Sequence, residues 1–250
     1  MVQTLGEPDL LSARRLLCVQ PHYDDNDIVA GGTLALLHDR GAEVTYLTVT
    51  DDLVGIVDPH LPDEQALAQL KREQAAAGEL IGVDRHIWLG FPDAGPLDYY
   101  NIRWQIIRQI RLLHPDFLVT CDPWLPYEAH RDHIMTGMAV AEASFLQSMP
   151  RFKTEAEVDR DYQPYALSGV AFYASQRPNT TIDISTTWER KRRAVACYQA
   201  QFTEEDMRRL LDQVEAEERV CAKGKTFSHA ETFKLLRPDQ LHLDTHTWQL

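Results

Sequence analysis

Short apolar runs alternate along the chain with longer segments in which apolar residues recur every three or four positions. Runs rich in Leu, Val, Ile and Thr are typical of buried strands in a parallel sheet. There are four such runs, at residues 16–19, 44–49, 87–89 and 117–120. Helical spacing predicts the helices between and after them, at residues 28–40, 63–81, 101–113 and about 130–148. This alternation predicts an α/β protein with a parallel sheet and right-handed crossovers, and no repeat or linker divides the chain.

The composition and charge exclude several classes of protein. The chain has 250 residues and a formal net charge of −13, whereas a nucleic-acid partner requires a basic face. No apolar run reaches the length of a membrane span, and residues 1–11 lack the basic start and apolar core of a secretory signal. The four cysteines are far apart, which is typical of buried thiols in a reducing compartment. We therefore expect a cytoplasmic protein without a nucleic-acid or membrane partner.

A dense cluster of ionisable residues follows the first predicted strand, in the stretch PHYDDND at residues 21–27. Open α/β sheets bind ligands at the carboxyl ends of their strands. Several ionisable groups in one turn are costly unless a positive charge lies among them, and a divalent metal ion is the simplest candidate. His22 and Asp25 are placed to reach such an ion, which leaves Asp24 free for proton transfer. The alternative is a solvated acidic turn with an aspartate that caps the next helix.

A second cluster, DPWLPYEAHRDH at residues 122–133, follows the fourth predicted strand. Its two histidines, His130 and His133, are three residues apart at the start of a helix and so can face the same side. His22, Asp25 and one of these histidines would supply two nitrogens and one carboxylate oxygen, the ligand set of a catalytic zinc ion. The other histidine, together with Asp132, would suit an acid whose tautomer is fixed by a carboxylate.

Taken together, these motifs resemble the PIG-L/LmbE-like zinc-dependent N-deacetylases, which remove the acetyl group from N-acetylglucosamine units. The segments that carry the resemblance are PHYDD at 21–25, GGTL at 31–34, LGFPD at 89–93, HRDH at 130–133, VAFY at 170–173, TIDI at 181–184 and AETF at 230–233. Within the family, residues 122–128 are most similar to the diacetylchitobiose deacetylases. The resemblance implies one Rossmann-like domain over residues 1–250, with a mostly parallel open sheet and helices on both faces.

The resemblance also implies a role for each polar residue of the two clusters. The implied metal ligands are His22, Asp25 and His133, the implied base is Asp24, and His130 with Asp132 would form the second histidine and its supporting aspartate. The implied cofactor is one zinc ion per chain, or another divalent metal. The implied assembly is a homo-oligomer, either a trimer or a hexamer.

Substrate contacts are predicted at five further positions. Asp93 resembles the residue that accepts a sugar hydroxyl in this family, while its alternative is a turn residue. Either Lys71 or Arg72 would supply a basic group to the sugar, unless both belong to a solvated helix face. Trp124 and Tyr127 would stack on a sugar face or, equally, pack the loop that contains them.

The activity that we predict is hydrolysis of the N-acetyl group of N-acetylglucosamine or short chitooligosaccharides, with release of acetate. Tyr198 and Ala200 stand where the family commonly has histidine and serine, which leaves that part of the pocket undefined. The alternatives are a deacetylase of another amino-sugar conjugate, such as a thiol pseudodisaccharide or a glycopeptide, and a noncatalytic carbohydrate- or metal-binding module. A module of that kind needs no free base such as Asp24. A nucleotide cofactor binder is disfavoured because no GxGxxG motif follows the first strand.

Overall fold

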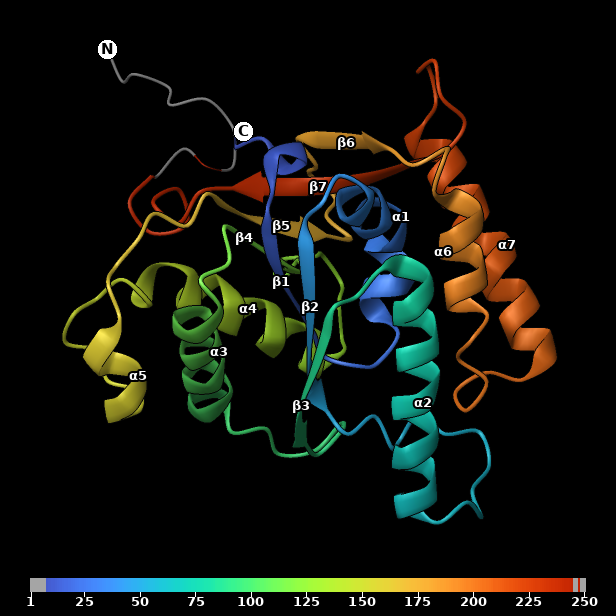
Figure 1. The fold of residues 1–250 in the computed structure, drawn as a ribbon. Coiled ribbons are helices and arrows are strands. Elements are labelled where there is room, and N and C mark those ends of the chain that lie inside the picture. Colours follow the sequence, from blue (N-terminus) through green and yellow to red (C-terminus); the bar gives the residue numbers. More distant parts are fainter. Residues whose placement is uncertain (1–7, 245–246, 248–250) are drawn as a thin grey trace.

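The computed structural model describes residues 8–244 and 247, and within this part of the chain one seven-stranded sheet lies between two layers of helices (Figure 1). The predicted domain, residues 1–250, therefore includes residues outside the described range. The strands are β1 (Arg15–Gln20), β2 (Glu43–Thr50), β3 (Arg85–Phe91), β4 (Phe117–Cys121), β5 (Gly169–Tyr173), β6 (Thr180–Asp183) and β7 (Ala230–Leu236). The α-helices are α1 (Asp25–Asp39), α2 (Asp63–Ile81), α3 (Tyr99–Leu113), α4 (Arg131–Leu146), α5 (Ala156–Asp161), α6 (Trp188–Val195) and α7 (Glu204–Cys221), and a 3-10 turn, η1 (Leu10–Ser12), precedes β1. None of the described helices is both long and apolar enough to cross a lipid bilayer.

The strand order of the sheet is β3-β2-β1-β4-β5-β7-β6, and it determines where a ligand can bind. The first five of these strands are parallel, and β7 runs antiparallel to both β5 and β6. The chain moves outward from β1 to β3 and then returns to place β4 on the other side of β1. Such a reversal leaves a crevice at the carboxyl ends of β1 and β4, where open sheets bind ligands.

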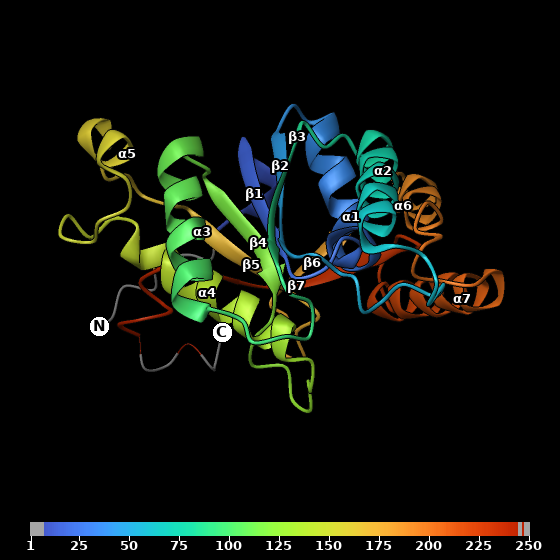
Figure 2. The ribbon, with the colours of Figure 1, turned by 90° about the horizontal axis from the view of Figure 1, so that it is seen from below.

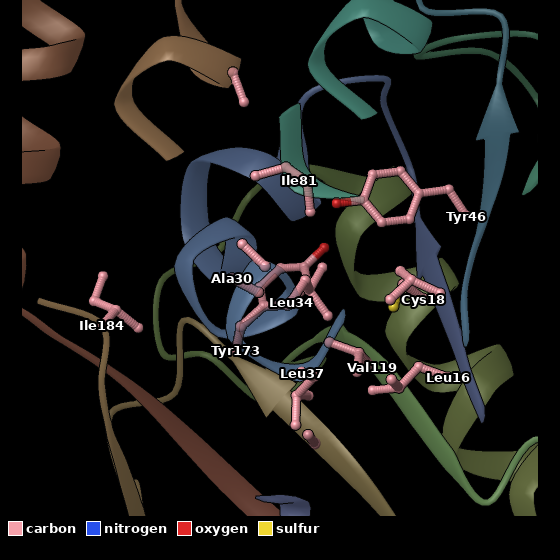
Figure 3. Close-up of a cluster of buried hydrophobic side chains, with 14 of the residues drawn as sticks. Leu16, Cys18, Ala30, Leu34, Leu37, Tyr46, Ile81, Val119, Tyr173 and Ile184 are labelled. Atoms are coloured by element: carbon pink, nitrogen blue, oxygen red, sulfur yellow. The ribbon is translucent and has the colours of Figure 1, made fainter. Parts of the chain in front are cut away.

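Helices cover both faces of the sheet, as predicted. Seen from below, α1, α2, α6 and α7 lie on one side, and α3, α4 and α5 lie on the other (Figure 2). Successive side chains of β1 enter different layers, because Leu16 and Cys18 pack with α1 whereas Leu17 and Val19 pack against α3 and α4. Figure 3 shows the first of these layers around α1. Full burial of each leucine contributes roughly 1.5–3 kcal/mol, so both layers hold their helices firmly on the sheet.

The middle of α1 approaches the segment before α6 very closely. A Cβ atom added to Gly32 would lie 2.7 Å from Cδ1 of Ile184. Because a side chain of any size would collide here, this contact requires a glycine. The hydroxyl of Thr187 also donates a hydrogen bond to the carbonyl oxygen of Gly32, at 2.7 Å.

A buried cluster of charged residues joins α1 to β7, the last strand along the chain. Lys191 of α6 is fully buried, and its Nζ donates hydrogen bonds to Glu218 of α7 and, at 2.7 Å, to Glu231 of β7. The Glu231 carboxylate also accepts the backbone N–H groups of Gly32 and Thr33 in α1, at 2.9 and 2.7 Å. One lysine and two glutamates are therefore buried together. Burial raises the pKa of Glu218 to about 7, with Lys191 acting to lower it and Glu231 to raise it.

Replacement of Glu218 by Gln is expected to weaken the pH dependence of stability. The folded-state pKa of about 7 exceeds the ordinary value of 4.5, so folded Glu218 keeps a proton over a range in which the unfolded chain has lost it. Its stabilising contribution is thus complete below the ordinary value and is lost as the pH rises through the folded value. As the pH rises from about 5 to about 8, the contribution of this residue to the free energy of unfolding should fall by about 2 kcal/mol.

Urea-induced unfolding at those two pH values measures the effect. Glu217→Gln, on an exposed position of the same helix, is the matched control and should behave like the wild type. If Glu218→Gln showed the same pH dependence of stability as the wild type, the buried cluster would not be the source of that dependence.

Candidate functional site

The two polar clusters predicted from the sequence meet at the carboxyl ends of β1 and β4. His22 follows β1, and α1 begins at Asp25, three residues earlier than predicted, so Asp25 belongs to the first turn of this helix. The early start follows from the stabilisation of acidic side chains by the positive end of a helix. His130 occupies the N-cap of α4, and His133 lies in its first turn. The ring centroids are 4.6 Å apart for His22 and His130, 5.2 Å for His22 and His133, and 4.9 Å for His130 and His133.

Carboxylates and imidazoles alternate across this site. Asp25 lies between two histidines, with Oδ2 3.3 Å from Nδ1 of His22 and Oδ1 3.5 Å from Nε2 of His133. The other ring nitrogen of His22, Nε2, is 3.3 Å from Oδ1 of Asp93 and 3.7 Å from Oδ2 of Asp132. The structure therefore brings the three predicted ligands together, and it adds two further carboxylates on the far side of His22.

The donor atoms of this cluster fit a metal ion. One ring nitrogen from each of His22, His130 and His133 lies within 4.8 Å of the others, and the same is true of the donor atoms of His22, Asp93, His130 and Asp132. Nε2 of His22 is buried and has no hydrogen-bond partner among the described residues. Burial lowers the pKa of His22, but Asp132, Asp25 and Asp93 raise it well above its usual value, so the surroundings favour a positive charge. Nitrogen and oxygen donors around such a position are what a divalent cation requires.

Among the described residues, Asp24 is the carboxylate of the first cluster whose side chain makes no hydrogen bond to another residue. It exposes only 6% of its surface, and its side chain makes no capping hydrogen bond to α1. Burial raises the pKa of Asp24 well above its usual value, and the charges of Asp25 and Asp52 raise it further. The alternative of a solvated turn capped by an aspartate is therefore wrong for this residue.

Asp132 is fully buried, and it connects α4 to the loop after β3. Its Oδ2 accepts the backbone N–H of Ala94 at 2.9 Å, while its Oδ1 has no hydrogen-bond partner within the described range. No hydrogen bond joins the side chains of Asp132 and His130 in the part of the chain that is described. The supporting role of Asp132 toward His130 remains a prediction, since the nearer contact of this carboxylate is with His22.

A cavity of about 310 Å³ opens over the cluster. Of the residues predicted for the site, those that line it are His22, Asp24, Asp25, Asp93 and His130. Sequence reasoning did not assign the other lining residues, which are Asp52, Val54, Gly55, Ala94 and Gln201. Asp52 had a usable signal, because it follows directly on β2 at the same edge of the sheet. Gln201 lies in a turn beyond α6, where neither a strand end nor a polar cluster marks it.

Asp52 supports the backbone between the first histidine and the free carboxylate. It is buried, and its backbone adopts a left-handed conformation with φ of 59°. Its Oδ2 accepts the backbone N–H of Tyr23 at 3.0 Å and Nε2 of Gln201 at 2.8 Å. Burial raises the pKa of Asp52 to about 7, although the charge of His22 works in the opposite direction.

Four of the predicted substrate contacts lie outside the set of residues that line the cavity. Nζ of Lys71 lies 5.1 Å from the centre of the Trp88 ring, and Arg72 is exposed on α2. Trp124 and Tyr127 are both exposed, and Tyr127 also has a left-handed backbone with φ of 69°. Contacts of these four side chains with a substrate remain predictions.

The two positions that depart from the family pattern lie behind the site, in the core. Tyr198 is fully buried, and its hydroxyl lies 2.5 Å from Oδ2 of Asp27 and 2.9 Å from the carbonyl oxygen of Tyr23. The backbone N–H of Ala200, which is also buried, donates to the carboxylate of Glu73 at 3.0 Å. The tyrosine therefore holds the same short backbone segment that Asp52 holds from the other side.

Asp52→Ala is expected to destabilise the protein by about 1–3 kcal/mol more than Asp52→Asn. Alanine leaves the buried N–H of Tyr23 without an acceptor, whereas asparagine keeps an oxygen there. Asparagine also tolerates the left-handed backbone better than alanine does. The free energies of unfolding of both variants in urea measure this difference, and equal values would remove Asp52 from its supporting role.

The chain as a whole is similar to a known family and to proteins of known structure. The profile of the family described as "PIG-L: GlcNAc-PI de-N-acetylase" matches residues 17–144. Diacetylchitobiose deacetylase from Thermococcus kodakarensis is 36% identical over 193 residues, which are 77% of this chain and 72% of that protein. The 1D-myo-inositol 2-acetamido-2-deoxy-alpha-D-glucopyranoside deacetylase from Streptomyces avermitilis is 34% identical over 170 residues, or 58% of each protein. A solved structure of N,N'-diacetylchitobiose deacetylase from Pyrococcus horikoshii superposes with a TM-score of 0.89 and 29% identity, covering 96% of this chain and 90% of that one.

Proposed function

Because the chain belongs to the PIG-L family of de-N-acetylases, we propose that it hydrolyses the N-acetyl group of N-acetylglucosamine or of short chitooligosaccharides and releases acetate. The observation that carries this proposal is the geometry of the site. Two histidines share the carboxylate of Asp25 beside a cavity that a separate, buried carboxylate, Asp24, also lines. A metal-binding module needs only the first of these features, whereas amide hydrolysis needs both.

We propose that the metal is one zinc ion per chain, held by His22, Asp25 and His133. The support for this set is that Asp25 already contacts both imidazoles through different oxygens. The ring nitrogens of His22, His130 and His133 lie close enough together to hold an ion, whereas Asp25 belongs to neither of the donor groups found among the described residues. A zinc ion bound there would lower the pKa of a water molecule and polarise the carbonyl group of the substrate.

In this proposal the remaining residues of the site divide the proton transfers between them. Asp24 takes a proton from the attacking water, which adds its oxygen to the acetyl carbon. His130, which also lines the cavity, gives a proton to the sugar nitrogen as the C–N bond breaks. The products are acetate and a free amino sugar. Asp132 contributes by fixing the loop after β3 through the N–H of Ala94.

The substrate part of the proposal is supported by the shape and charge of the same cavity. Asp93 lines the cavity, and its carboxylate, which already contacts Nε2 of His22 and the backbone N–H of Val54, would accept a sugar hydroxyl as an additional hydrogen bond. A neutral sugar is not repelled by the surrounding carboxylates. The second candidate substrate is a glucosaminyl-inositol conjugate, because a relative named for that activity shares 34% identity with this chain. Assembly into a trimer or hexamer remains a prediction.

Asp24→Asn should retain one zinc ion per chain and lose most of its activity. Asp24 is not one of the proposed ligands, and loss of a general base typically lowers the rate by about 100- to 10,000-fold. Acetate release from diacetylchitobiose gives the rate, and metal analysis of the same samples gives the zinc content. Asp63→Asn, at an exposed position of α2, is the control and should match the wild type in both measurements. Wild-type turnover by zinc-loaded Asp24→Asn would assign the base elsewhere.

Diacetylchitobiose should be a better substrate than N-acetylglucosaminyl-inositol. The comparison is of kcat/KM for both compounds with the wild-type protein under one set of conditions. We expect a preference of about 10-fold or more, because one or a few altered contacts in a pocket discriminate by about that factor. The reverse preference would replace the substrate in this proposal and leave the deacetylase chemistry unchanged.

A further inference from the structure

The loop between β4 and α4 carries a carboxylate that contacts both histidines of the second cluster. Oε1 of Glu128 accepts the backbone N–H of His130 at 2.7 Å. Oε2 of Glu128 lies 3.3 Å from Nδ1 of His133. The side chains of His133 and Glu128 are 25% and 20% exposed, so the contact between them is partly shielded from water.

Each ring nitrogen of His133 faces a carboxylate, and of the two carboxylates only Asp25, beside Nε2, is a proposed metal ligand. Nδ1 faces Glu128, whereas Nε2 faces Oδ1 of Asp25, 3.5 Å away. A neutral imidazole that offers a lone pair on one nitrogen must carry its proton on the other. A carboxylate beside Nδ1 accepts a hydrogen bond from a proton on that atom. In the proposed metal site Nε2, beside Asp25, would supply the lone pair, and Nδ1, beside Glu128, would keep the proton.

We propose that Glu128 is a positioning residue, which holds the proton of His133 on Nδ1 and so prepares Nε2 to bind the metal ion. This inference rests on the metal site of the proposed function. Histidines that ligate metals commonly donate their other N–H to a carboxylate, which fixes the tautomer and orients the ring. The second oxygen of Glu128 acts at the start of α4, where it holds the backbone of His130. One side chain thereby sets the tautomer of one histidine and the backbone position of the other.

Glu128→Gln tests this role, because glutamine keeps the size of the side chain and removes its charge. Its single oxygen can accept only one of the two N–H groups, and its NH₂ group opposes the other. We expect zinc to bind about 10- to 100-fold more weakly, as happens when such a partner of a metal ligand is lost. The affinity is measured by titrating zinc into metal-free protein in competition with a chromophoric chelator. Glu157→Gln, at an exposed position of α5, is the control and should bind zinc as the wild type does.

A spectroscopic measurement separates positioning from general support of the loop. In zinc-loaded protein with ¹⁵N-labelled histidine, His133 of the wild type should show a protonated Nδ1 whose proton resonates downfield because of the hydrogen bond. In Glu128→Gln this proton signal should move upfield or be lost through exchange with water. Its assignment follows from the spectrum of His133→Gln. A purely structural role of Glu128 would leave the signal unchanged.

The possible outcomes distinguish this inference from the proposal on which it rests. If the wild type binds zinc and Glu128→Gln binds it within about 2-fold, or if the His133 signal does not change, the role of Glu128 is wrong and the metal site stands. If the wild type binds no zinc, the proposed metal site fails and this inference fails with it. Should Glu128→Gln not fold, Glu128→Asp and Glu128→Asn form a second pair of equal length. The asparagine variant should then bind zinc about 10-fold more weakly than the aspartate variant.

Discussion

The position of α1 depends on one buried carboxylate, that of Glu231. This side chain of β7 accepts two backbone N–H groups from the middle of α1 and a hydrogen bond from Lys191. Buried charges are tolerated only when their partners are in place, so α1, α6 and β7 are held to one arrangement. Gly32 allows α1 to approach Ile184 at the same level. The first turn of α1 carries Asp25. The antiparallel strand β7 therefore fixes the helix that brings this residue to the site beside the parallel strands.

Much of this architecture could be predicted from the sequence because its signals are local. The apolar runs identified four of the five parallel strands and missed β5, and helical spacing identified α2. The insertion of β7 between β5 and β6 could not be predicted from such patterns, since strands that pair across long stretches of chain leave no local trace. The burial of Lys191 was equally hidden. It lies in a short helix rich in charged residues, and two carboxylates from other elements are what allow it to be buried.

In the candidate site, too, some residues could be predicted from local sequence signals and others could not. The two polar clusters were visible because each is a dense run of ionisable residues at a predicted strand end, and the structure brings them together. The start of α1 was misplaced, because the apolar spacing of the helix begins only after its acidic first turn. Asp52 was missed although it follows the end of β2, and its contact with the backbone of Tyr23 is what reveals its role. Gln201 was missed because it lies in a turn and is tied to the site only through its hydrogen bond to Asp52. A dense motif can therefore be found in a sequence, whereas the residues that support it become visible only in the fold.

The place of β7 has a consequence for how the protein is made on the ribosome. In the described sheet β6 pairs only with β7, which is synthesised after the whole of α6 and α7. Until β7 emerges, the nascent chain contains every residue of the two polar clusters, but β6 has no pairing partner and Lys191 lacks one of its two carboxylates. An unpaired strand edge in a partly folded chain is prone to aggregation. The antiparallel end of the sheet is thus completed last, and the edge of β6 stays without its partner strand until β7 has been synthesised.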